Sequence, residues 1–159
     1  MPSFHASLVT TVRQKIVTAA RWGIANEPRI HYGEVRPIRF GRTLPLTTDC
    51  SGFVTVCYYL AGAPDPNGRS YDGSGYTGTM LGWLSRLAGP ADAKRGDLVV
   101  WGAYPGRHVA LVLEPGEDPL LCSHGAEHGP IAIRCSEESK WQPPELVWLT
   151  RSSRPSRPE

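Results

Sequence analysis

The two halves of this 159-residue chain carry different hydrophobic patterns, and this difference limits the folds open to it. Before Gly89 the apolar residues recur at helical spacing, and residues 7–22 place Leu8, Val12 and Ile16 on one stripe of an amphipathic helix. After Gly89 the apolar residues gather in short β-like runs, at residues 98–101, 109–113, 120–123, 131–134 and 147–149. Helices followed by strands predict an α+β fold, with N-terminal helices packed on a mostly antiparallel sheet of five to six strands.

Two more helices are expected in the first half of the chain. Residues 51–60 form an apolar stretch that Thr48 or Asp49 can cap, and residues 79–87 suit a short helix. Prolines and glycine interrupt residues 29–48, which predicts a long ordered loop, or a loop with a short strand.

The segment 64–79 is rich in glycine and also carries Tyr71 and Tyr76. This composition suits a shaped loop that presents aromatic side chains and walls a cleft. Tyr71, Tyr76 and Trp83 are candidates for a substrate groove, and structural packing explains them equally well.

The length of the chain suits one domain with a single core, because two ordinary domains and a linker need more residues. We expect that domain to span residues 1–150, followed by a disordered tail or linker stub at 151–159, where apolar residues are lacking. The N-terminus lacks the charged and apolar pattern of an export signal, and no apolar run reaches the ~18 residues of a membrane span. We therefore expect no signal peptide and no membrane insertion.

Charge and cysteine content restrict the function classes further. The formal net charge is +2, and Lys and Arg do not cluster with aromatic residues, so we expect no nucleic acid partner. The four cysteines, Cys50, Cys57, Cys122 and Cys135, contain no C-x-x-C pair. Their spacing leaves disulfides open, except between Cys50 and Cys57, which lie about 10 Å apart along one predicted helix. We assign the last three to the core.

Cys50 stands where the second predicted helix begins. The first turn of a helix has unpaired backbone N–H groups and the positive end of the helix dipole, so it stabilises an anion. The thiolate is the form of cysteine that attacks carbon. This placement makes Cys50 a candidate nucleophile, and the competing interpretation is an inert small hydrophobic residue.

Two histidines downstream complete a possible catalytic set. His108 opens one predicted strand and His124 follows the next, so both lie at the same end of one hairpin, whose strands are ~4.8 Å apart. The order is nucleophile, base and orienting group, and Glu127 or His128 could orient the base in place of His124. Histidine and cysteine are also metal ligands, but no pair here has a known zinc spacing, so we expect no metal and no cofactor.

Three motifs together resemble the signature of the NlpC-type papain-like cell-wall peptidases. They are DCSGFV at 49–54, GDLVVW at 96–101 and HVALVL at 108–113, with a weaker match in SHG at 123–125. The resemblance implies a papain-like NlpC-type fold and a cysteine endopeptidase or amidase. Such an enzyme hydrolyses amide bonds in peptidoglycan stem peptides, frequently the bond between D-glutamate and a diamino acid.

The resemblance also implies a Cys-His-His triad. On this sequence Cys50 is the nucleophile, His108 is the general base and acid, and His124 is the polar third member that holds the imidazole. The hairpin between His108 and His124 is longer than is usual in the family.

Three further residues match positions that surround the nucleophile in the family. Asp49 and Ser51 match positions that contact the stem peptide. Tyr32 is the nearest counterpart of a tyrosine that helps to stabilise the oxyanion, although it lies farther upstream of Cys50 than the family's tyrosine does.

The stretch SHGAEHGP at 123–130 is similar to phage-encoded wall hydrolases. That similarity implies a monomer made in the host cytoplasm that acts on the bacterial cell wall, as an endolysin released at lysis or as part of the virion. Two alternatives stay open: a thiol acyltransferase or transpeptidase with the same triad, and a non-catalytic wall-binding tail module.

Overall fold

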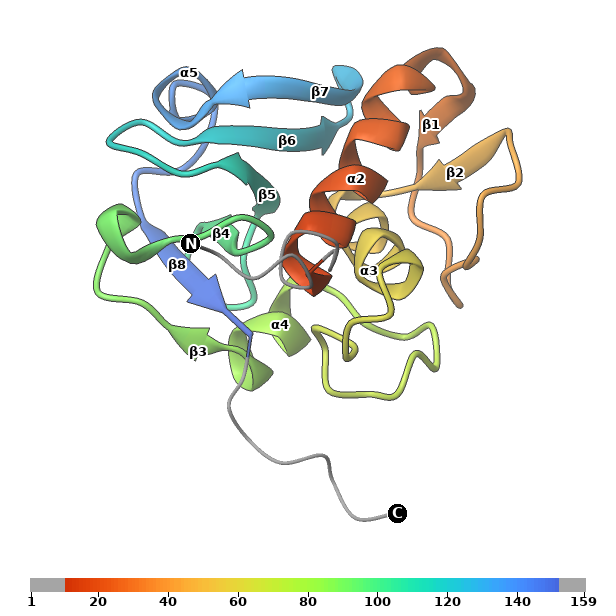
Figure 1. The fold of residues 1–159 in the computed structure, drawn as a ribbon, viewed down its shortest axis with the longest axis horizontal. Helices are drawn as coiled ribbons and strands as arrows, with labels where there is room; N and C mark the ends of the chain where they lie inside the picture. The colour runs from red at the N-terminus through yellow and green to blue at the C-terminus, as the bar shows by residue number, and fades with distance from the viewer. Residues whose placement is uncertain (1–10, 152–159) are drawn as a thin grey trace, which may run out of the picture.

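The computed structural model describes residues 11–151, which form one six-stranded sheet with helices packed against it (Figure 1). All neighbouring strands are antiparallel, in the order β3-β8-β4-β5-β6-β7. The strands are β3 (Ser85–Arg86), β4 (Leu98–Trp101), β5 (His108–Glu114), β6 (Leu120–Gly125), β7 (His128–Arg134) and β8 (Leu146–Thr150). The five β-like runs are confirmed as strands, and β3 is an addition.

The helices are α2 (Val12–Ala25), α3 (Cys50–Leu60), α4 (Thr77–Trp83) and α5 (Cys135–Ser139), with 3-10 turns η1 (Glu27–Arg29) and η2 (Pro90–Asp92). Thr11 caps α2 through a capping box, and the part of the expected helix before residue 11 lies outside the described residues. The helix expected at 79–87 instead ends at Trp83, because the chain then enters β3 and pairs with β8. Helix α5 was not expected.

The segment 29–48 contains two short strands, β1 (Ile30–Tyr32) and β2 (Leu46–Thr48), which pair in parallel. The expectation of a loop with a short strand is therefore confirmed and extended. Their register places Tyr32 opposite Thr48, two residues before Cys50. This pairing brings a distant part of the sequence to the start of α3.

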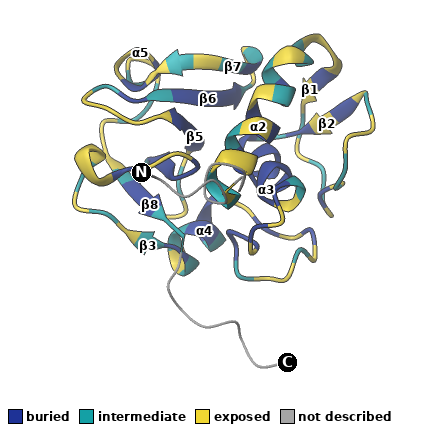
Figure 2. Cartoon of the chain, in the orientation of Figure 1, coloured by how far each residue is buried: buried dark blue, intermediate teal, exposed yellow. Residues whose placement is uncertain are grey.

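The large sheet is buried on both faces, and successive strand residues belong to different cores. Val109 and Leu111 of β5 pack on the side of α2 and α3, together with Phe53. Ala110 and Trp101 belong to a second cluster on the other face, which includes Cys135 of α5. Figure 2 shows α3 and the central strands in the colour of buried residues. The expected α+β architecture is thus confirmed.

Two expectations about the ends of the chain are not decided by this architecture. A single domain over 1–150 remains a prediction, since residues 1–10 are outside the described range. The expected tail is described only at Arg151. Among the described residues, no helix has the length and apolar content needed to cross a bilayer.

Candidate active site

Cys50 is the first residue of α3, and Asp49 is its N-cap. The Asp49 side chain accepts a hydrogen bond from the Gly52 N–H at 2.8 Å, and the Asp49 carbonyl accepts one from the Phe53 N–H at 2.9 Å. The N–H groups of Cys50 and Ser51 precede this first helical bond. Both lie at the positive end of the helix, next to the sulfur.

The structure places the predicted pair, Cys50 and His108, close enough for the thiol to raise the pKa of the imidazole. His108 is the first residue of β5, and its ring stacks on Trp101 with centroids 5.5 Å apart. Only 7% of the Cys50 surface and 6% of the His108 surface are exposed, so the pair is largely shielded from water.

The other ring nitrogen of His108 faces Glu138 of α5 and Ser123 of β6. His108 Nε2 lies 3.0 Å from Glu138 Oε1 and 2.7 Å from Ser123 Oγ. The Ser123 hydroxyl donates to the same Glu138 oxygen at 2.7 Å, so its own oxygen is left to accept from Nε2. Since Nε2 is occupied here, Nδ1 is the nitrogen left for the thiol.

These partners change the protonation of His108 and Glu138. Burial alone lowers the pKa of His108, but the hydrogen bonds and charges of Cys50 and Glu138 outweigh it and raise that pKa to about 9. Burial also raises the pKa of Glu138, and the bonds from His108 and Ser123 bring it below its ordinary value. The site therefore favours a histidinium beside the Glu138 carboxylate.

His124 does not occupy the place expected for the third member, because Glu138 and Ser123 hold that place. Side chains alternate along a strand, so His124 points to the face opposite that of Ser123. Its Nε2 donates to the Thr48 carbonyl at 2.7 Å, and its ring packs on Tyr32 and Phe53. Burial lowers the pKa of His124, which keeps the ring neutral.

The alternatives to His124 lie at the rim of the site. Glu127 stands in the β6–β7 turn, and His128 opens β7, where its Nδ1 is 2.9 Å from the Gly129 carbonyl. Both residues line a cavity of about 750 Å³ beside His108. Their position suits contact with a bound molecule better than support of the imidazole.

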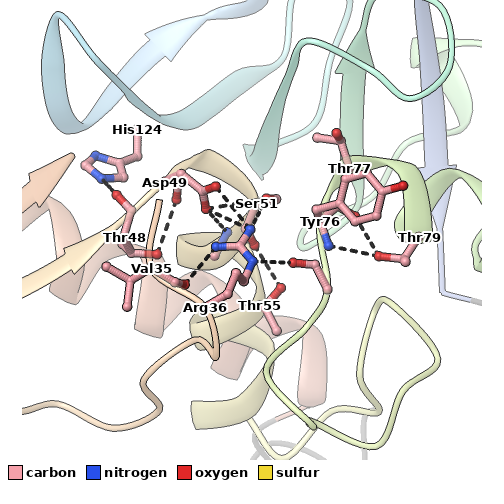
Figure 3. A network of polar contacts seen from close by, with 12 residues as sticks. Val35, Arg36, Thr48, Asp49, Ser51, Thr55, Tyr76, Thr77, Thr79 and His124 are labelled. Atoms are coloured by element: carbon pink, nitrogen blue, oxygen red, sulfur yellow. Dashed lines mark hydrogen bonds and ion pairs between the residues drawn. The ribbon is translucent and has the colours of Figure 1, made fainter. Parts of the chain in front are cut away.

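Arg36 ties the start of α3 to two loops (Figure 3). Its guanidinium bonds Asp49 at 3.0 and 3.2 Å and the Ser51 hydroxyl at 3.2 Å, and its Nε donates to the Gly75 carbonyl at 3.0 Å. Asp49 and Ser51, expected to contact the stem peptide, therefore already have internal partners. Ser51 is only 3% exposed.

Tyr32 lines the cavity beside His108, together with Arg107 and Trp141. Burial and the charges of Cys50 and Asp49 raise the pKa of Tyr32, so its hydroxyl keeps its proton near the sulfur. Trp141, which lines the same cavity, is 80% exposed. The parallel pairing of β1 with β2 thus compensates for the long separation of Tyr32 from Cys50 in the sequence.

The fold has a counterpart among solved structures, whereas no protein-family model and no curated protein sequence matches the chain. The NlpC/p60 domain of the peptidoglycan hydrolase SagA matches with a TM-score of 0.58 and 22% sequence identity. The match covers 87% of this chain and 97% of that chain. The chain has the NlpC/p60 fold.

Within this NlpC/p60 fold, three residues of the site escaped the sequence analysis. Ser123 directly precedes His124 in the sequence. The sequence motif was therefore recognised, but which of its residues lies on the strand face of His108 was not. Glu138 lies in a short helix without apolar periodicity, and Arg36 lies in an irregular loop. Neither carries a local signal, because only the tertiary fold brings it to the site.

All four cysteines are unpaired thiols. Burial raises the pKa of Cys57 and Cys122 well above its ordinary value, to about 12 for Cys122, which agrees with their assignment to the core. Within residues 11–151, no three His, Cys, Asp or Glu side chains converge as a metal site.

Proposed function

We propose that this protein is a cysteine peptidase or amidase that hydrolyses amide bonds in the stem peptides of peptidoglycan. The observation that carries the proposal is the chain of contacts from Cys50 to His108 and from His108 to Glu138, at the N-terminus of a helix. The NlpC/p60 fold, found in a peptidoglycan hydrolase, supports the choice of substrate.

In the proposed acylation step, the Cys50 thiolate attacks the carbonyl carbon and a C–S bond forms. The N–H groups of Cys50 and Ser51, with the Tyr32 hydroxyl, donate hydrogen bonds to the oxyanion. His108 gives its proton to the departing amine as the C–N bond breaks. This leaves a thioester on Cys50 and a neutral imidazole.

In the proposed deacylation step, His108 takes a proton from water while the water oxygen attacks the thioester. The C–S bond then breaks, the carboxylic acid leaves, and the thiolate and histidinium are restored. Glu138 acts in both steps as a positioning residue, because its carboxylate holds Nε2 and stabilises the charged ring.

The test is digestion of purified cell walls, followed by mass spectrometry of the released fragments. Cys50→Ala should abolish release, and His108→Ala should lower the rate by on the order of 10²–10⁴. Cys135→Ser is a matched control, since this thiol lies away from the sulfur of Cys50 and near Ser139. Undiminished digestion by Cys50→Ala would refute the proposal.

The same digestion separates hydrolysis from acyl transfer. A hydrolase releases a new carboxylic acid, whereas a thiol acyltransferase or transpeptidase joins the acyl group to an added amine. A non-catalytic wall-binding module would sediment with the wall and release nothing. We propose hydrolysis because water is the acceptor always at hand, and because the NlpC/p60 fold occurs in a peptidoglycan hydrolase.

We also propose a phage origin, with the protein acting as a monomeric lysin or as a virion-associated enzyme. It rests on the similarity of residues 123–130 to phage-encoded wall hydrolases, and in the structure part of this stretch lines the cavity beside His108. Purified protein added from outside should then clear suspensions of susceptible cells. Activity on isolated wall without any clearing of cells would argue against a lysin.

A further inference from the structure

We propose that a second cavity, on the far side of the β4–β5 turn from the active site, binds a saccharide of the glycan strand. The proposal rests on the proposed function and names more of its substrate: a stem peptide still attached to its sugar. The cavity has a volume of about 580 Å³, within the usual range of ligand sites. The residues that matter for binding are Arg69, Asp72, Tyr76, Thr79, Trp83 and Tyr104.

The cavity combines aromatic surfaces with polar edges, as a sugar requires. Tyr104 is 72% exposed and Tyr76 is 40% exposed, and the two phenols are close enough for Tyr104 to raise the pKa of Tyr76. Aromatic rings can pack against the C–H faces of a sugar ring, while nearby polar groups bond its hydroxyl and amide groups. The pair of tyrosines thus presents apolar surface where it is accessible from solvent.

The charges around the cavity favour a neutral ligand. Arg69 and Asp72 contribute opposite charges, and Ser74 bonds to both, at 3.3 Å and 2.7 Å. An anionic ligand such as a nucleotide would meet Asp72, and a cationic one would meet Arg69. N-acetylated hexosamines of the glycan backbone offer many hydrogen-bonding groups and need no net charge in the site.

The wall of the cavity is held in shape before any ligand binds. The buried Asp65 carboxylate accepts hydrogen bonds from the backbone N–H groups of Asn67, Arg69 and Tyr71. Gly68 has φ of +66°, and a Cβ there would lie 2.3 Å from the Trp83 ring. A fixed loop loses little conformational freedom on binding, which favours affinity.

The position of the cavity fits a peptide that joins it to the nucleophile. Tyr104 lines this cavity and Arg107 lines the one beside His108, and three residues span at most about 11 Å. Thr77 donates to the Pro105 carbonyl at 2.7 Å, which fixes the turn between the two cavities. A stem peptide of about three extended residues can therefore span from a sugar at Tyr104 to the cavity beside His108.

Kinetics with two matched substrates test this proposal. One substrate is a stem peptide linked to its N-acetylated sugars, and the other is the same peptide released from them. We expect kcat/KM to be about tenfold higher for the linked form, which corresponds to about 1.4 kcal/mol. Tyr104→Ala should bring the ratio of the two values close to one, while Tyr104→Phe, which keeps the ring, should preserve most of it. Equal kcat/KM for both substrates in the unmodified protein would overturn the proposal.

A titration separates this proposal from the proposed function. A soluble N-acetylglucosamine oligomer, which has no peptide to cleave, is added to isotope-labelled protein and followed by NMR. We expect the indole N–H signal of Trp83 to shift, and Tyr104→Ala to weaken binding about tenfold. Failure to cleave either peptide would refute the proposed function and leave the titration decisive for the saccharide site. An unmoved Trp83 signal at millimolar oligomer would overturn the saccharide site alone.

Discussion

At the residue scale, Glu138 is the side chain whose charge is best placed to control His108. Glu138→Gln keeps the shape and a hydrogen bond but removes the carboxylate that stabilises the histidinium. We expect kcat/KM to fall by about 10- to 100-fold and the alkaline limit of activity to move to lower pH. The measurement is a pH–rate profile of both proteins.

Glu137→Gln is a matched control for that experiment. Glu137 is the sequence neighbour of Glu138, but it is exposed and pairs with Lys140 on the surface. Its replacement should leave the alkaline limit in place. If both variants shift the limit equally, the effect belongs to general surface charge and Glu138 has no positioning role.

The raised pKa of His108 predicts the pH dependence of the unmodified protein. Activity needs the histidinium to protonate the leaving amine, so kcat/KM should decline as pH rises through about 9. Stability should follow the same direction: the contribution of this raised pKa is fully present below the ordinary value of 6.5 and is lost between about 6.5 and 9. Denaturant unfolding at intervals across this range checks the second part. A decline of kcat/KM centred near pH 7 would contradict the first part, and a free energy of unfolding that does not fall between pH 6.5 and 9 would contradict the second.

His124 provides a separate test, because the structure gives it a role outside the catalytic contacts. His124→Leu removes the hydrogen bond to the Thr48 carbonyl and should reduce the free energy of unfolding by about 1–3 kcal/mol. We expect the alkaline limit of the surviving activity to stay where it is. A clear shift of that limit would instead make His124 the orienting group that the family resemblance implied.

At the scale of elements, Arg36 holds the start of α3 to the loop that contains Gly75. Arg36→Gln should leave Asp49 without its ion pair and lower the free energy of unfolding by about 1–3 kcal/mol. Since the pair is partly exposed, the lower half of this range is expected. The control is Arg39→Gln, an exposed arginine in the same segment. Equal losses of stability in both variants would contradict a special role for Arg36.

The elements also show why part of the site could be predicted from sequence and part could not. Cys50 and His108 each open an element whose start is marked by local signals: a capping residue before the helix, and an apolar run after the turn. Ser123 and His124 differ by one position, and which strand face each takes depends on pairing with β5, which a single sequence does not reveal. Glu138 could only be predicted together with helix α5, and the five residues of this helix have no apolar stripe that would reveal it.

At the scale of the whole molecule, the site is assembled from both sides of the sheet. The Cys50 thiol comes from α3 on one side of the sheet, and the Glu138 carboxylate comes from α5 on the other. His108 lies between them at the start of β5. The helices-then-strands pattern was sufficient to predict this layered architecture. It could not predict that the second face would also be covered and would supply a functional group.

The expected boundary of the domain gives a prediction at the same scale. Removal of residues 152–159 should leave the melting temperature unchanged, because β8 ends at Thr150. Truncation after residue 145 should instead abolish cooperative unfolding, since it removes β8 from between β3 and β4. Thermal unfolding followed by circular dichroism distinguishes the two. A marked loss of stability in the shorter deletion would show that the domain extends beyond residue 150.

The position of β8 between β3 and β4 has a consequence for biosynthesis. Strand β4 can pair with β5 as soon as both have been translated, but β3 lies at the edge and pairs with β8, so it can join the sheet only after β8 has left the ribosome. The nascent chain therefore carries its sulfur and imidazole for some time before the scaffold that aligns them is complete.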